Sequence, residues 1–112
     1  MFVHIVEDDP GVGDSLALLL AQIGHESRVY PDAESFFECH PPDAEDTVIV
    51  DLGLPGLSGM QVVRWLSGLK TPPKVIAITG QPSRAIAEVV DGHLPAILLR
   101  KPLTEESLVS HL

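Results

Sequence analysis

The chain has 112 residues, of which 45% are hydrophobic, and it carries a formal net charge of -9. This length and composition predict one domain with a proper core, and the single adjacent basic pair, Arg100 and Lys101, disfavours direct binding of nucleic acid. No apolar run reaches the roughly 18 residues that a membrane span needs. The lone Cys39 cannot form an intramolecular disulfide, so we expect a reduced thiol and a cytoplasmic protein with no membrane partner.

Strand-like and helix-like segments alternate along the chain. In the first half, the pattern predicts strands at 2–6, 27–30 and 47–50, and helices at 10–23, which ends at Gly24, and at 32–39, which Asp32 caps. In the second half, it predicts helices at 59–69, at 83–90 and from 104 onward, and strands at 75–78 and 96–99. Five strands alternating with five helices indicate right-handed crossovers and an α/β fold, with a five-stranded parallel sheet covered by helices on both faces.

Polar side chains stand where the apolar strands end. The stretch VIVDLGLPGLSG places Asp51 directly after three β-branched residues that are typical of a strand buried on both faces. The other strand ends add Glu7 and Asp8, Thr79, and Lys101. Ligands of such sheets bind at the carboxyl ends of the strands. Carboxylates that lie close together repel one another unless a cation compensates them, and hard oxygen ligands suit Mg²⁺, so the strand ends predict a site for a metal ion and a phosphoryl group.

Several of these residues have an ordinary structural interpretation. Asp9 before Pro10 is better explained as a helix N-cap than as a metal ligand. Thr79 alone would be a strand residue, and Lys101 alone a solvated surface charge, so the joint placement carries the hypothesis. The five histidines are scattered, and we interpret them as structural or solvated: His4, His25, His40, His93 and His111.

The stretches IVEDD, VDLGLPGLSG, ITG and LLRKPL, in this order over essentially the whole chain, resemble the receiver domain of two-component response regulators. The resemblance implies a flavodoxin-like fold with strand order 2-1-3-4-5. It also implies a single receiver domain over residues 1–112, and we expect this domain to be cut within its last helix and to come from a longer regulator. The stretches TG and LPGLSG are most similar to receivers that precede a DNA-binding output domain.

The resemblance assigns roles to the strand-end residues. Asp51 becomes the phosphoacceptor, and Mg²⁺ is the cofactor, held by Glu7, Asp8, Asp51 and the backbone carbonyl of Gly53. Thr79 and Lys101 contact the phosphoryl oxygens. Thr79 and Leu98 take the switch positions, and because many receivers have Tyr or Phe where this chain has Leu98, we expect Thr79 to carry most of the response.

The implied function is a signalling switch and not an enzyme, although the domain assists its own phosphorylation and dephosphorylation. The phosphoryl group would come from a sensor histidine kinase or a histidine phosphotransfer protein. Its arrival would shift the surface of the fourth helix and fifth strand, which would control an output domain, a partner or a homodimer.

Two other functions share some of these sequence features. A phosphohydrolase of the haloacid dehalogenase type also uses an aspartate after a hydrophobic strand, but it needs a second aspartate two residues later, where this chain has Gly53. A receiver-like interaction module that is never phosphorylated is disfavoured, because every position of the site carries a competent residue.

Overall fold

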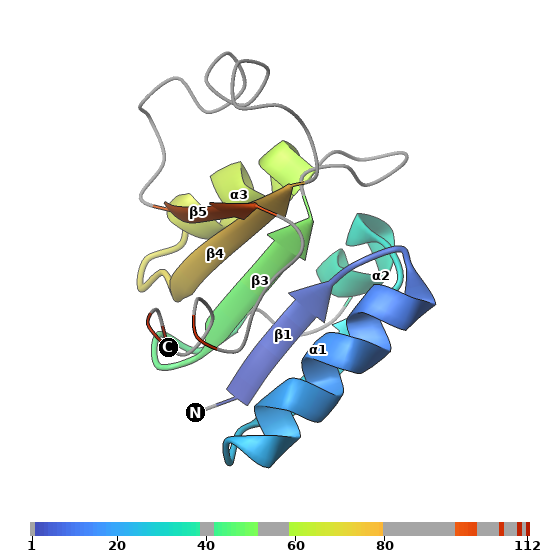
Figure 1. Cartoon of the computed structure of the whole chain (residues 1–112). Helices are drawn as coiled ribbons and strands as arrows, with labels where there is room; N and C mark the ends of the chain where they lie inside the picture. Colours follow the sequence, from blue (N-terminus) through green and yellow to red (C-terminus); the bar gives the residue numbers. More distant parts are fainter. Residues whose placement is uncertain are drawn as a thin grey trace.

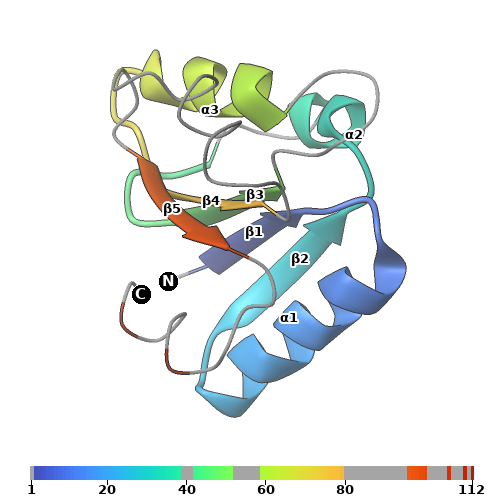
Figure 2. The same cartoon turned by 45° about the horizontal axis from the view of Figure 1, so that its top comes forward.

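The computed structural model describes residues 2–38, 42–51, 59–79 and 96–100, together with Glu106, Ser110 and Leu112. Within these ranges the chain forms five strands and three helices. Figures 1 and 2 show their arrangement from two directions. The strands are β1 (Phe2–Val6), β2 (Glu26–Tyr30), β3 (Thr47–Asp51), β4 (Lys74–Thr79) and β5 (Ala96–Arg100), and the helices are α1 (Pro10–Gln22), α2 (Ala33–Phe37) and α3 (Gly59–Ser67).

The five strands form one parallel sheet in the order β2-β1-β3-β4-β5. This order confirms the prediction of a flavodoxin-like fold, in which the winding direction reverses beside β1. Helix α1 covers one face of the sheet, and α2 and α3 cover the other (Figure 2). The helices expected at 83–90 and from 104 onward fall mostly outside the described residues, as does Cys39.

Two hydrophobic clusters hold these layers together, one on each face. Under α1, the buried side chains come from alternate positions of the strands and from the inner side of the helix: Val3, Ile5, Leu16, Leu20, Ile49, Ile76 and Ile78. Under α2 and α3, the cluster includes Val6, Phe36, Val48, Val50, Val62, Val63 and Leu66. Neighbouring residues of β3 thus point into different clusters, and all five residues of this strand are buried. The aliphatic run before Asp51 is therefore covered on both faces, as predicted.

Both ends of α1 follow from local sequence signals. Oδ1 of Asp9 accepts hydrogen bonds from the main-chain N–H groups of Gly11 and Val12, and Pro10 takes the first helical position, so the predicted N-cap is confirmed. At the other end Gly24 adopts φ +91°, a backbone conformation that is unfavourable for residues with a Cβ atom. The N–H of Gly24 then donates to the carbonyl of Ala21, and that of His25 to the carbonyl of Leu20, which closes the helix in a Schellman motif.

The other two described helices are shorter than predicted. Asp32 caps α2 by accepting a hydrogen bond from the N–H of Ser35 at 2.7 Å, and hydrogen bonds from the Ser35 main chain and side chain hold the pKa of Asp32 below its ordinary value. The helix nevertheless ends at Phe37. Helix α3 ends at Ser67, because Leu69 donates to the carbonyl of Leu66 in a tightened terminal turn. Among the described residues, no helix has both the length and the apolar character required to cross a bilayer.

Candidate functional site: a carboxylate cluster at the strand ends

Three carboxylates meet where β1 and β3 end. Asp51 is the last residue of β3, and Glu7 and Asp8 follow the last residue of β1. The two strands are parallel neighbours with Val6 opposite Val50, so their carboxyl ends lie at the same edge of the sheet. One oxygen from each of the three carboxylates lies within 4.8 Å of the others. The fold thus brings Asp51 to two acidic groups that lie more than forty positions before it in the sequence.

The three carboxylates differ in exposure. Glu7 is 1% exposed and Asp51 4% exposed, whereas Asp8 is open to solvent. Ionised carboxylates repel one another at these separations, and repulsion is strong where burial removes the screening by water. A positive charge placed between them would relieve this repulsion.

Glu7 is held in place by two main-chain hydrogen bonds. Its N–H donates to the carbonyl oxygen of Tyr30 at 3.0 Å, which extends the β1–β2 ladder beyond its last residue pair. Its Oε1 accepts a hydrogen bond from the N–H of Asp9 at 3.2 Å. The carboxylate of Asp9 itself is turned to the N–H groups of α1, so Asp9 supports the cluster through its main chain and leaves three carboxylates as candidate ligands.

This donor set fits a hard divalent cation. All three candidate ligands are carboxylates, and Mg²⁺ and Ca²⁺ prefer oxygen ligands in proteins. No cysteine or histidine joins the cluster among the described residues, so the chemistry favours such cations over zinc or copper.

Two of the four remaining predicted site residues lie in the part of the chain that the structure describes. Thr79 is the last residue of β4 and lies one position beyond Ile78, the register partner of Asp51, so its main chain reaches the same edge of the sheet as the cluster. Leu98 lies in the middle of β5, opposite Ala77. Gly53 and Lys101 lie outside the described residues.

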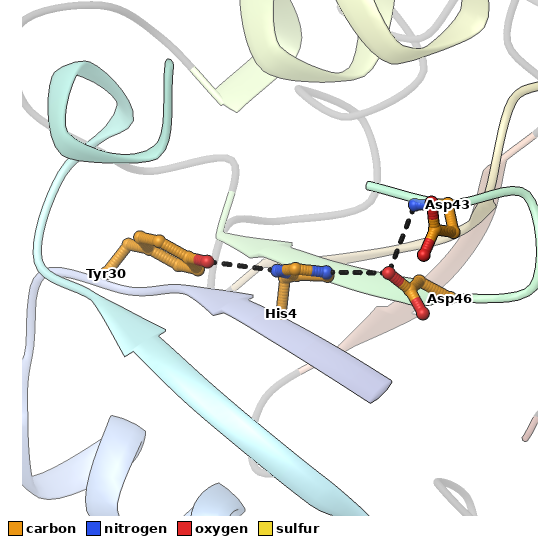
Figure 3. A network of polar contacts seen from close by, with 4 residues as sticks. All are labelled: His4, Tyr30, Asp43 and Asp46. Carbon is orange, nitrogen blue, oxygen red and sulfur yellow. Dashed lines mark hydrogen bonds and ion pairs between the residues drawn. The ribbon is translucent and has the colours of Figure 1, made fainter. Parts of the chain in front are cut away.

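Sequence reasoning missed one polar network on the sheet. The His4 ring lies between the hydroxyl group of Tyr30 and the carboxylate of Asp46, at 3.0 Å from each (Figure 3). The available signal was a histidine inside an apolar strand, because a buried polar group needs partners. Its partners could not have been named, since they lie 26 and 42 positions away.

Comparisons with known proteins agree with this architecture. The profile of the response regulator receiver domain matches residues 3–112. Over 111 residues the chain is 35% identical to the sensory transduction protein RegX3 of Mycolicibacterium smegmatis, covering 98% of this chain and 48% of that protein. It is 27% identical over 108 residues to the transcriptional regulatory protein FixJ of Azorhizobium caulinodans, covering 96% of this chain and 51% of that protein.

The chain therefore spans about half the length of these curated relatives. Among solved structures, the response regulator receiver protein from Burkholderia phymatum superposes with a TM-score of 0.80 and 30% identity, covering 97% of this chain and 89% of that one. The family profile, the relatives and the five-stranded sheet all lead to one conclusion: this chain belongs to the response regulator receiver domain family.

Proposed function

We propose that this chain is a phosphorylation-dependent signalling switch in which Asp51 accepts a phosphoryl group. Receiver domains are signalling domains of two-component systems, and a phosphorylation switch is their general function. The observation that carries the proposal is the cluster of three carboxylates within 4.8 Å, with Asp51 buried at the end of β3. Its donor would be a phosphohistidine of a sensor kinase or of a phosphotransfer protein.

The transfer is a substitution at phosphorus. An oxygen of Asp51 forms a bond to phosphorus, the bond between phosphorus and the donor imidazole nitrogen breaks, and the leaving imidazole takes up a proton. Mg²⁺, held by Glu7, Asp8, Asp51 and the carbonyl of Gly53, would neutralise charge on the phosphoryl oxygens. The buried surroundings of Asp51 keep bulk water from screening these interactions.

We assign the remaining phosphoryl contacts to Thr79 and Lys101. The end of β4 beside β3 supports this assignment for Thr79, because a hydroxyl group there can donate a hydrogen bond to an oxygen of the aspartyl phosphate. Lys101 would supply a cation for another oxygen. Thr79 and Leu98 would then carry the change to the surface of the fourth helix and β5.

An output domain or a partner protein would respond to this surface. The chain spans about half of relatives that are named as a transcriptional regulatory protein and a sensory transduction protein, which supports a receiver domain over residues 1–112 that controls a further module. Dimerisation of phosphorylated receivers is one route to such control. We place the protein in the cytoplasm, where its phosphodonor would be found.

Phosphorylation by a small-molecule donor tests the proposal directly. Incubation with acetyl phosphate and Mg²⁺ should add the mass of one phosphoryl group, and borohydride reduction with peptide mapping should place it on Asp51. The variants Asp51→Asn and Asp8→Asn should remain unmodified, whereas Asp14→Asn, which removes an exposed carboxylate from α1, should be modified as the wild type is. Modification of Asp51→Asn to the wild-type level would contradict the assignment.

The binding of Mg²⁺ can be tested separately from the transfer of the phosphoryl group. Because Mg²⁺ would bind only the folded cluster, it should raise the unfolding free energy by about 2.7 kcal/mol at a concentration one hundred times its Kd. Asp8→Asn should abolish this gain, and without Mg²⁺ it should be at least as stable as the wild type, since it removes one of three repelling charges. An equal rise in unfolding free energy in both proteins would mean that Mg²⁺ binds at another site.

A further inference from the structure

Hydrogen bonds on both sides of Tyr30 connect the segment before β3 with the main chain of Glu7, a member of the carboxylate cluster. Asp46 accepts from Nε2 of His4 at 3.0 Å, and Nδ1 of His4 lies 3.0 Å from the hydroxyl group of Tyr30 (Figure 3). The carbonyl oxygen of Tyr30 in turn accepts from the N–H of Glu7 at 3.0 Å. The path therefore starts near the amino end of β3 and reaches a candidate metal ligand at the carboxyl end of β1.

The chemistry of the partners fixes the protons on the neutral His4 ring. An ionised carboxylate can only accept hydrogen bonds, so Nε2 must carry the proton that it donates to Asp46. Nδ1 is then an acceptor, and the hydroxyl group of Tyr30 must donate to it. Protonation of the ring would turn Nδ1 into a donor and would force the Tyr30 hydroxyl group to reverse its role.

Charged groups of both signs lie around the His4 ring. The His4 side chain is 12% exposed and that of Asp46 14% exposed, so the carboxylate attracts an imidazolium with limited screening. Arg28, opposite His4 on β2, holds its guanidinium 5.2 Å from the centre of the Tyr30 ring and opposes a second positive charge nearby. From the 43–46 turn, Asp43 contributes its N–H to Asp46, while its exposed carboxylate adds a weaker attraction.

The rings that pack on His4 carry no charge. Phe2, Tyr30 and Phe36 lie with their ring centres 5.0, 5.9 and 6.1 Å from that of His4. Tyr30 and Phe36 also contact each other edge to face at 5.2 Å. A change at the Tyr30 hydroxyl group is therefore transmitted to a ring that is packed on several sides, and this ring belongs to the residue whose carbonyl group holds Glu7.

We propose that His4 is a positioning residue for the carboxylate cluster, acting through Tyr30, and that protonation of its ring weakens the binding of Mg²⁺ there. The inference rests on the proposed function, because it takes the cluster to be a Mg²⁺ site. Two effects act in the same direction. Reversal of the Tyr30 hydrogen bond loosens the support of Glu7. In addition, His4 and Glu7 are three residues apart, so a strand rise of roughly 3.3 Å per residue separates their main chains by about 10 Å, and an imidazolium at this range repels a bound cation. By linkage, Mg²⁺ would in turn disfavour the imidazolium.

Substitutions can separate the hydrogen bonds that His4 makes from the protonation of its ring. In His4→Gln the amide group can donate to Asp46 and accept from Tyr30 but cannot titrate, so Mg²⁺ affinity at pH 8 should be retained and should not fall with pH as the wild-type affinity does. Tyr30→Phe removes only the hydroxyl group, and we expect about two- to fivefold weaker binding at pH 8 from the loss of one hydrogen bond in the path. The matched control is His25→Gln, which removes a half-buried histidine at the end of α1.

The measurement is the Mg²⁺ dissociation constant by calorimetry at pH 8 and pH 6 and constant ionic strength. The wild type and His25→Gln should bind several-fold more weakly at pH 6, and His4→Gln and Tyr30→Phe should show a smaller ratio between the two pH values. The same ratio in all four proteins would overturn the inference and leave the proposed function standing. Absence of Mg²⁺ binding in every protein would instead contradict the proposed function, and the inference with it.

A second measurement needs no metal ion and no variant. Long-range ¹⁵N–¹H correlation spectra of the wild type at pH 8 should show His4 with its proton on Nε2. A proton on Nδ1 would reverse the hydrogen bonds and overturn the inference.

Discussion

The main-chain N–H of Asp9 donates a hydrogen bond to Oε1 of Glu7 at 3.2 Å. The side chain of the same aspartate accepts from the N–H groups of Gly11 at 2.8 Å and of Val12 at 3.4 Å. One residue thus begins α1 and also orients a buried carboxylate of the candidate metal site. The position of this helix start and the geometry of the cluster are therefore linked through a few covalent bonds.

Removing the Asp9 side chain should lower the stability of the domain. We expect Asp9→Ala to reduce the free energy of unfolding by about 1 kcal/mol, the usual loss for an N-cap, and urea denaturation would measure it. Asp9→Asn keeps an acceptor at the cap and should lose much less. Because the Asp9 carboxylate serves the helix and not the cluster, Asp9→Asn should also bind Mg²⁺ with nearly wild-type affinity, and a large loss of affinity there would make Asp9 a ligand.

The parts of this structure that local signals specify were predictable from the sequence. Apolar runs with β-branched residues gave the strands, Asp9 with Pro10 gave the start of α1, and Gly24 gave its end. Strand order and the meeting of Glu7 with Asp51 then depended on the resemblance and on the rule that parallel strands end at one edge. The polar partners of His4 were not predictable, because no local pattern pairs a β1 residue with Tyr30 and Asp46.

The close contact between α1 and β2 was equally hidden in the sequence. Gly13 is buried on α1, and a Cβ added there would lie 2.9 Å from Cγ1 of Val29. A helical glycine looks unfavourable by propensity alone, so sequence reasoning gives no cause for its presence. The packing supplies the cause, since only a residue without a side chain lets the helix approach the strand this closely.

Gly13→Ala should therefore destabilise the domain although alanine is the better helix former. The gain in helix propensity is about 1 kcal/mol, and overpacking a buried contact costs about 1–3 kcal/mol, so we expect a net loss of about 1 kcal/mol in urea denaturation. Gly68→Ala is the matched control, because its added Cβ would lie at an ordinary 3.5 Å from the carbonyl of Trp65. The pair Gly13→Ala with Val29→Ala should be less destabilised than the sum of the single variants, and strict additivity would rule out the contact as the cause.

The Asp46 carboxyl group should make stability depend on pH in the acid range. Burial raises the pKa of Asp46, but hydrogen bonds from His4 and the Asp43 and Phe2 main chains, with attraction to the His4 ring, outweigh it and bring the pKa below its ordinary value. A carboxyl group whose pKa is lower in the folded state adds stability above its unfolded pKa of about 4, and this stability is lost as the pH falls through the folded value.

Comparison with Asp46→Asn isolates this contribution. The difference in unfolding free energy between the wild type and Asp46→Asn should shrink as the pH falls below about 4, where the Asp46 carboxylate of the folded state takes up a proton. Asp43→Asn is the control, since its exposed side chain should leave the wild-type pH dependence unchanged. A difference that grows as the pH falls below about 4 would mean that the pKa of Asp46 is raised, and not lowered, in the folded state.

The response to phosphorylation would begin at the ends of β4 and β5. Thr79 ends β4 opposite Arg100, while Leu98 lies two residues earlier on β5, opposite Ala77. A hydroxyl group at Thr79 can bind a phosphoryl oxygen directly, but leucine has no polar end that could exchange solvent for a buried hydrogen bond. The free-energy difference between the two states should therefore depend mainly on Thr79.

Thr79→Ala should weaken the response to beryllofluoride, and Leu98→Ala should largely retain it. The measurement is the set of amide shifts that beryllofluoride with Mg²⁺ induces in β4 and β5, together with the change in dimerisation. Thr79→Ser is the matched control, because it keeps the hydroxyl group and should keep the response. Since alanine at 79 removes a hydrogen-bond donor while alanine at 98 removes only apolar volume, loss of the response in Leu98→Ala but not in Thr79→Ala would show that packing of β5, and not the threonine, couples the phosphoryl group to the surface.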